Sequence, residues 1–298
     1  MTGGQVDAHH HVWSLARGDY GWLTPALAPI HRDFTLDDLA PHVRAAGIAT
    51  TVLVQAAPTV AETHFLLDVA RGSGGLVGGV VGWVDLATDE AVATLTVLAR
   101  DPHFKSVRPM LQDLPDSAWI LRPDVATCLA ALPGLGLRLD ALVTPRELPA
   151  LVTMLERHGG LAVVIDHGAK PSIASGKRAT WHSRLRELAA HPGVHCKLSG
   201  LVTEAAAGWT VEDLRPYADA ILAAFGPHRV MWGSDWPVVE LAGGYARWRA
   251  ASVALLADLA PAERAAVLGG TARRFYGLDG SDAGQPPPTT LDGGRHCD

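Results

Sequence analysis

The order in which strands and helices are predicted constrains this fold more than any other sequence feature. Short runs rich in Val, Ile and Leu alternate along the chain with longer segments whose apolar residues recur every three or four positions. The short runs are typical of buried strands and the longer segments of amphipathic helices. The strand-like runs begin at residues 5, 50, 78, 105, 136, 161, 194 and 229, and the helix-like segments span 35–46, 61–71, 88–100, 123–132, 145–158, 182–191, 211–225 and 245–258.

Eight strands that alternate with eight helices predict a parallel sheet, because each helix returns the chain to the same strand direction. We therefore expect an α/β protein with a single domain, a (β/α)₈ TIM barrel over residues 1–278. A doubly wound open sheet is the alternative fold. It is disfavoured because neither a G-x-G-x-x-G motif nor a P-loop follows a strand-like run.

The last part of the chain divides into two segments of different character. Residues 260–276 have a helical pattern, and we expect this helix to complete the outer ring of the barrel. Residues 279–298 are polar and rich in Pro and Gly. Such a segment cannot bury enough apolar surface to order itself, so the sequence predicts a disordered tail.

The charge of the chain argues against two classes of partner. The formal net charge is −6, and Lys and Arg form no block, so the sequence predicts no basic surface for nucleic acid or an anionic membrane. There is no apolar stretch of the ~18 residues that a membrane span needs, and the first residues lack the pattern of a secretory signal. We expect a cytoplasmic protein whose partner is a small molecule; its oligomeric state cannot be read from the sequence.

Three consecutive histidines, His9, His10 and His11, lie in the first strand-like run, QVDAHHHVWS. Side chains of a strand alternate between its two faces. This period predicts that Asp7, His9 and His11 share one face and that His10 points the other way, toward the helices. Barrels of this class carry their active sites at the carboxyl ends of the strands. We therefore expect His9 and His11 at the mouth of the barrel, with His10 as a spacer.

Polar side chains end the other strand-like runs as well, and the same rule places them around the mouth. In chain order they are Gln55, Asp85, Arg108, Asp140, Asp166 with His167 and Lys170, Lys197 with Ser199 and Glu204, and Ser234 with Asp235.

Four motifs at successive strand ends resemble the amidohydrolase superfamily, in the branch that includes sugar lactonases such as L-fuconolactonase. They are D-A-H-H-H-x-W in the first strand, I-D-H-G-A-K-P in the sixth, C-K-L-S-G-L-V-T-E in the seventh and M-W-G-S-D-W-P in the eighth. The similarity covers residues 6–277 in the same order. The resemblance implies hydrolysis of an ester, lactone or amide bond by a bound water, with the aspartate of the eighth strand as general base.

Asp235 is the residue at that position. Its neighbours Trp232 and Trp236 would partly desolvate the carboxylate, which would raise its basicity toward the working range. The competing interpretation is that Asp235 caps the helix or loop that follows. We expect Asp235, His9, His11 and His167 to be the catalytic residues.

The same four side chains, His9, His11, His167 and Asp235, would give one divalent metal four nitrogen and oxygen ligands, a set that suits Zn²⁺. The family's usual metal site adds a lysine from the fourth strand and a histidine from the fifth, and neither is present here: the only lysine of the fourth run is Lys105, at its start. The metal is therefore expected to be mononuclear if it is present. Without a metal, the imidazoles and a cation could hold the oxyanion directly.

Further residues are candidates for binding the substrate. Arg108 and Lys170 are the available cations, and an ion pair at the barrel rim is the alternative role for each. Indole rings can pack on a sugar ring, and carboxylate and amide groups can bond its hydroxyls. The remaining candidates are Trp13, Trp22 and Trp236 for stacking and Gln55 and Glu204 for hydrogen bonds, whereas we expect Trp83 and Trp232 to pack between the barrel and its helices.

The leading hypothesis from the sequence is therefore a sugar-lactone hydrolase that acts on an aldonolactone such as L-fuconolactone. The lack of an arginine cluster disfavours a di- or tricarboxylate substrate. Two alternatives stay open at this point: a Zn-dependent decarboxylase of the same superfamily, and a sugar-acid binding protein without catalytic activity.

Overall fold

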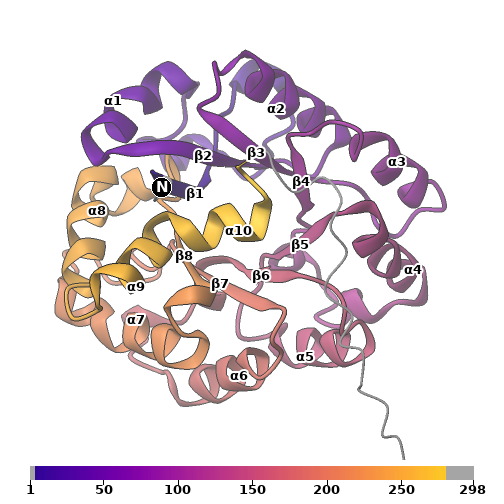
Figure 1. Ribbon diagram of the computed structural model, residues 1–298. Coiled ribbons are helices and arrows are strands. Elements are labelled where there is room, and N and C mark those ends of the chain that lie inside the picture. The colour runs from indigo at the N-terminus through magenta and orange to yellow at the C-terminus, as the bar shows by residue number, and fades with distance from the viewer. Residues whose placement is uncertain (1–3, 280–298) are drawn as a thin grey trace, which may run out of the picture.

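The computed structural model describes residues 4–279 and confirms the (β/α)₈ barrel (Figure 1). Eight parallel strands form one sheet in the order of the chain, and helices surround it. All but one residue of the expected tail, 279–298, lies outside the described part of the chain. The strands are β1 (Gln5–His10), β2 (Ile48–Val54), β3 (Val77–Gly82), β4 (Phe104–Val107), β5 (Arg138–Ala141), β6 (Val163–Ile165), β7 (Val194–Leu198) and β8 (Val230–Trp232).

A helix follows each strand, and short 3₁₀ turns extend several of the loops between a strand and its helix. Polar caps help to set helix starts: Thr210 precedes α7, and its backbone N–H donates to Asp213 Oδ2 at 2.8 Å in a capping box. The helices of the outer ring are α1 (Leu36–Ala46), α2 (Val60–Gly72), α3 (Ala91–Leu98), α4 (Pro123–Ala131), α5 (Leu148–Arg157), α6 (Ala179–Ala189), α7 (Val211–Phe225) and α8 (Gly244–Leu255). Within residues 4–279, no helix has the length and apolar character that a membrane span requires.

The strands bury two different faces. Outward residues such as Leu53, Val80 and Leu139 belong to the large apolar cluster that joins the sheet to the helices. Inward residues such as Val52 and Val164 belong to a smaller cluster inside the barrel. Burial on both faces explains why the strands read as nearly continuous apolar runs.

The helix expected over residues 260–276 is present, but it does not complete the outer ring. It consists of α9 (Pro261–Ala265), one π-helical turn and α10 (Thr271–Tyr276), and it crosses the end of the barrel at which the strands begin (Figure 1). Phe275 and Tyr276 pack against the inward residues there. This helix therefore closes the bottom of the barrel, opposite the mouth.

An irregularity in β1 changes the face on which Asp7 lies. Asp7 pairs with Thr51, but His10 pairs with Leu53, so β1 uses one residue more than β2 between these pairs. Asp7 Oδ2 accepts a hydrogen bond at 3.2 Å from the hydroxyl of Tyr245 in α8. The expectation that Asp7 shares a face with His9 and His11 is therefore wrong, because strict alternation does not survive a bulge.

The barrel closes between β1 and β8 through the residues that follow β8. The backbone N–H of Asp235 donates to the carbonyl of His9 at 2.8 Å, and that of His11 donates to the carbonyl of Trp236 at 2.7 Å. The side chain of Asp7 adds a third link, since Asp7 Oδ1 accepts from the backbone N–H of Ser234 at 2.8 Å. These bonds fix the loop of Asp235 directly onto the histidine strand.

Candidate active site

A cavity of about 170 Å³ lies at the carboxyl ends of the strands, where the sequence predicted the site. His9 lies beneath this cavity and is fully buried. Six of the predicted site residues line it: His11, Trp22, Arg108, His167, Lys170 and Asp235.

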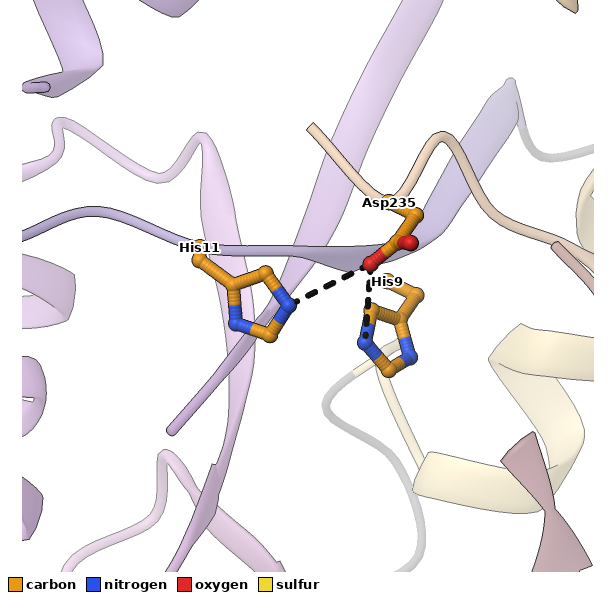
Figure 2. Close-up of side chains that lie close together, drawn as sticks. All are labelled: His9, His11 and Asp235. Carbon is orange, nitrogen blue, oxygen red and sulfur yellow. Dashed lines mark ion pairs between the residues drawn. The ribbon is translucent and has the colours of Figure 1, made fainter. Parts of the chain in front are cut away.

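Three imidazoles converge on one oxygen of Asp235. The Nε2 atoms of His11, His9 and His167 lie 3.4, 3.7 and 3.9 Å from Asp235 Oδ1. Figure 2 shows that the rings of His9, near the end of β1, and His11, directly after this strand, both face one oxygen of the Asp235 carboxylate. His167 and Asp235 are distant in sequence from His9 and His11, and all four side chains reach one point because the strands β1, β6 and β8 end at the same rim of the barrel.

The loops that carry these side chains have an unusual backbone. Among residues 4–279, the non-glycine residues with left-handed φ are His167, Ala169, Lys170 and Asp235, with φ between 45° and 62°. Such conformations are costly and typically cluster at functional sites. All four belong to the loops after β6 and β8, so the strain is confined to the segments that aim His167 and Asp235 inward.

Two glycines make room for the histidines. A Cβ atom on Gly233 would lie 2.6 Å from the Cβ of His9. Gly200 has a φ of 62°, and a Cβ there would lie 2.5 Å from Nδ1 of His167. These contacts account for the glycines of the M-W-G-S-D and K-L-S-G motifs, because any side chain would displace an imidazole.

The other ring nitrogens fix the orientation of two histidines. His11 Nδ1 lies 2.8 Å from the carbonyl oxygen of Val54, which can only accept, so the Nδ1 proton points at Val54. His167 Nδ1 lies 2.9 Å from Ser199 Oγ. In its neutral form His11 therefore directs the lone pair of Nε2 toward Asp235 Oδ1. Both of these atoms are acceptors, so a proton or a cation is needed between them.

The protonation states follow from burial and from these neighbours. Burial alone would raise the pKa of Asp235, but His167, His11 and His9 outweigh it and hold that pKa below its ordinary value. The expectation that desolvation raises the basicity of Asp235 is therefore wrong. Burial lowers the pKa of His167 from 6.5 to about 4, so at neutral pH an ionised carboxylate faces a neutral imidazole.

His10 lies outside this cluster. Its Nε2 is 2.9 Å from the hydroxyl of Thr51 on β2, and it pairs with Leu53, an outward residue of the cluster that contacts the helices. Burial lowers the pKa of His10 to about 3. The structure thus places His10 as a spacer between two site residues.

A buried network of charges beneath the pocket supports His9, and the sequence did not reveal it. The ammonium of Lys197 donates to Asp140 Oδ2 at 2.6 Å and lies 3.0 Å from Asp166 Oδ1 and 3.2 Å from His9 Nδ1. These side chains are fully buried inside the barrel. Tyr276 of α10 donates its hydroxyl to Asp140 Oδ2 at 2.8 Å and so connects the network to the closed end.

The charges in this network compensate one another. Burial opposes ionisation of Asp166, but Lys197, His9 and Arg108 outweigh it and lower its pKa well below the usual value. Burial raises the pKa of Asp140. Burial together with the Lys197 charge lowers the pKa of His9 well below 6.5. The sequence did contain one signal for this network, namely a lysine and two aspartates at or next to inward strand positions. Such residues are almost never fully buried unless they are paired.

Arg108 is held in place from below the pocket. Its guanidinium donates to Asp166 Oδ2 at 3.1 Å and to the carbonyl of Gln55. Gln55 was predicted to bind substrate, but it is fully buried and its amide donates to the carbonyl of Arg108 at 2.9 Å. Gln55 therefore positions Arg108 rather than lining the cavity.

Two of the three tryptophans predicted to stack on a sugar are in the core instead. Trp13 and Trp236 are each 1% exposed, and both pack edge to face on Phe34. Both lie just beyond the ends of their strands, where the chain leaves the sheet. Trp22 is 37% exposed and lines the cavity. Its indole N–H donates to the carbonyl of Ala56 at 2.7 Å, which leaves the ring face for a ligand.

The last two predicted residues point to a neighbouring cavity of about 440 Å³. Lys170 lines both this cavity and the active-site pocket, whereas Glu204 lines only the neighbour. Burial raises the pKa of Glu204. The structure brings Lys170, but not Glu204, to the wall of the pocket that holds Asp235.

The residues around Asp235 fit a divalent metal. His9 Nε2 is buried and has no hydrogen-bond partner within residues 4–279, and His9, His11 and Asp235 offer ligand atoms that lie within 4.8 Å of one another. Imidazole nitrogen and carboxylate oxygen are ligands of Zn²⁺ and of other divalent ions. His9, Asp166 and His167 form a second group whose ligand atoms lie within 4.8 Å of one another. This group is less suited to a metal ion, because Lys197 already places a positive charge 3.0 Å from Asp166.

Comparison with known proteins identifies relatives of the whole barrel. The sequence profile of the family described as Amidohydrolase matches residues 6–278. An L-fucono-1,5-lactonase from Burkholderia ambifaria is 47% identical over 279 residues, which cover 92% of this chain and 96% of the relative. A second L-fucono-1,5-lactonase, from Burkholderia multivorans, is 38% identical over 92% of this chain and 96% of its own length.

A solved structure agrees with these sequence matches. A crystal structure of an amidohydrolase from Burkholderia multivorans with bound zinc superposes with a TM-score of 0.87. It is 38% identical to this chain, and the alignment covers 92% of this chain and 99% of that one. The architecture described above is therefore shared with that structure over 92% of this chain.

Proposed function

Because this chain belongs to the amidohydrolase family, we propose that it is a hydrolase that opens a sugar lactone, with L-fucono-1,5-lactone as the first substrate to test. The observation that carries the proposal is the convergence of three imidazoles on one carboxylate oxygen at the base of the mouth, 3.4 to 3.9 Å away. Two relatives of full length are named L-fucono-1,5-lactonases, which supports the same substrate class.

The reaction needs a base, a water and a site for the oxyanion. Asp235 takes a proton from the attacking water, whose oxygen forms a bond to the lactone carbonyl carbon. The negative charge that develops on the carbonyl oxygen is stabilised by Arg108 and Lys170 on the pocket wall and by His167, whose Nε2 carries the proton when Ser199 donates to its Nδ1. The ring C–O bond then breaks, and the alkoxide receives the proton from Asp235, which yields a hydroxy acid.

The low pKa of Asp235 makes it a weak base, so the substrate must have a reactive carbonyl group. A lactone is a more reactive acyl donor than an amide, because an alkoxide leaves more readily than an amine. Pairing a weak base with cations that polarise the carbonyl therefore suits an ester ring and not a peptide bond. Arg108 and Lys170 number too few to hold the two or three carboxylates of a polyacid by bidentate contacts.

A divalent metal, if bound, would be held by His9, His11, His167 and Asp235 and would act as a Lewis acid toward the carbonyl or the water. We propose Zn²⁺ as the ion, since the ligand set suits it and a relative's crystal structure contains zinc.

The test is hydrolysis of a panel of aldonolactones, L-fucono-1,5-lactone included, in a pH-indicator assay with and without chelator. We expect wild type to acidify the medium and Asp235→Asn to lose about 10²- to 10⁴-fold in kcat/KM. If no lactone is opened faster by wild type than by Asp235→Asn, the proposal is wrong. Lactone binding without turnover would identify a sugar-acid binding protein, and release of CO₂ from a hydroxybenzoate would identify a decarboxylase.

A further inference from the structure

A cavity of about 680 Å³ adjoins the active-site pocket and has no part in the reaction proposed above. Trp22, Met110 and Asp113 line both cavities, so they share a wall. The active-site pocket, at about 170 Å³, is smaller than the ~300–1,000 Å³ usual for small-molecule sites, whereas the two together fall within that range. The volume indicates a ligand that extends from Asp235 into the larger cavity.

The walls of this cavity carry aromatic rings from three loops. Trp22 comes from the loop after β1, Trp83 from the loop after β3 and Trp119 from the segment after β4. Trp83 was expected to pack between barrel and helices. Instead its backbone N–H and carbonyl are bonded to the hydroxyl of Thr63 at 2.8 and 2.9 Å, and its half-buried ring lines the cavity. Indole faces of this kind pack on the apolar face of a sugar ring.

Carboxylates at the rim distinguish a sugar from a purely apolar group. Asp19, Asp85 and Asp113 all line the cavity. Asp85 Oδ1 accepts from the backbone N–H of Ala87 at 3.1 Å, and Asp113 Oδ1 accepts from the amide of Gln112 at 3.2 Å. Both residues are exposed, so their other oxygens can accept from hydroxyl groups of a ligand. Negative charge on this wall disfavours an anionic substituent.

We propose that this cavity binds a second, neutral sugar ring attached to the lactone, so that the substrate class includes lactones of glycosylated aldonic acids. The inference rests on the proposed lactone hydrolysis. The bond that breaks is still the ring C–O bond of the lactone, water supplies the new C–O bond, and the glycosidic bond to the second sugar stays intact.

The test compares matched substrates: L-fucono-1,5-lactone, its galactopyranosyl derivatives at O2, O3 and O4, and benzyl ethers at the same positions. We expect at least one galactosyl derivative to have a KM about tenfold below that of the parent. Trp119→Ala and Trp83→Ala are expected to lower kcat/KM for that derivative at least tenfold and for the parent less than twofold. Trp119→Phe, which keeps an aromatic face, should retain most of the preference.

Controls separate this inference from the proposed function and from misfolding. Leu241→Ala changes an exposed side chain of the other neighbouring cavity and should leave both substrates unaffected. Unchanged thermal unfolding of the tryptophan variants would show that they fold. Calorimetry on Asp235→Asn, with and without Trp119→Ala, measures the affinity for the parent lactone and for its galactosyl derivatives. The difference between the two affinities reports on the second ring even where turnover is absent.

Three results would overturn the inference. One is that wild type hydrolyses every galactosyl derivative at least tenfold less well than the parent lactone and that Asp235→Asn also binds every derivative at least tenfold more weakly. Another is that Trp119→Ala weakens parent and derivative equally. The third is that a benzyl ether is preferred to its galactosyl counterpart, which would mean that the cavity selects an apolar group.

Discussion

At the scale of single residues, the site depends on which ring nitrogen of each histidine faces Asp235. Alternation along a strand was enough to place His9 and His11 at the mouth and His10 away from it. It was not enough to place Trp13 and Trp236, because the chain leaves the sheet near both residues and the period of two no longer applies. Their burial depends on contacts with Phe34, which is distant from Trp236 in sequence.

The three consecutive histidines are expected to respond differently to mutation. His10→Gln keeps a polar partner for Thr51 and should change kcat/KM by less than twofold, whereas His9→Ala and His11→Ala should each lower it at least tenfold, a loss of ~1.4 kcal/mol in transition-state stabilisation. Steady-state kinetics on one lactone, with circular dichroism to check folding, measures this. Equal losses at all three positions would contradict the placement of His10.

The pKa shifts predict the acid limb of the pH profile. The reaction needs ionised Asp235 and neutral His167, because a protonated His167 would pair with Asp235 Oδ1, which lies 3.9 Å from its Nε2, and weaken that oxygen as a base. Because both pKa values are depressed, that of His167 to about 4, both states persist above pH 5 and are lost only in more acidic solution. For chelator-treated enzyme, kcat/KM should be flat from pH 8 to about pH 5 and fall near pH 4 as His167 gains a proton. A midpoint above pH 6 would disagree with the burial of His167 as its cause.

At the scale of elements, the order and type of the strands and helices could be read from the sequence, whereas the local geometry of β1 could not. Apolar runs identify strands because both faces are buried. A bulge leaves no comparable signal, since an extra residue does not alter the composition of the run. The bulge matters because it lets Asp7 bond to α8 and to the loop after β8, while His9, two residues later, faces the interior.

Asp7 is therefore expected to hold the loop of Asp235 in place. Asp7→Ala leaves the backbone N–H of Ser234 buried without a partner, which costs about 1–3 kcal/mol, while Tyr245→Phe removes only one hydrogen bond, worth about 1 kcal/mol. Urea unfolding should rank the two variants in this order, and Asp7→Ala should also lower kcat more than Tyr245→Phe does. Asp7→Asn, which keeps an acceptor, is the matched control; equal stability of all three variants would remove Asp7 from this role.

At the scale of the whole molecule, the interior changes from apolar at its lower layers to charged beneath the mouth. Lys197 of β7 contacts His9 of β1, Asp140 of β5 and Asp166 directly after β6, so one ammonium joins four of the eight strand segments. The pairing of these side chains could not be predicted, because it depends on barrel closure rather than on any local pattern.

The expected cytoplasmic location also stays a prediction.

Removing that ammonium should destabilise the entire domain. Lys197→Met leaves Asp140 and Asp166 as buried charges with too little compensation, and breaking a buried pair in this way costs about 3–5 kcal/mol. The double variant Lys197→Met with Asp140→Asn should recover part of the loss, because one of the two charges is gone. Thermal and urea unfolding of the single and double variants measures this. A single variant as stable as wild type would mean that the network contributes nothing to the fold.

Both ends of the described chain lie at the closed bottom of the barrel. The carbonyl of Gly4 accepts from Arg273 of α10 at 3.0 Å, and the carbonyl of Gly277 accepts from Lys105 at the start of β4 at 3.3 Å. The mouth, with Asp235, is at the other end. A bead or a reporter protein attached directly at Gly4 or at Asp279 would therefore sit at the bottom of the barrel and leave the entrance open to the bulk solution.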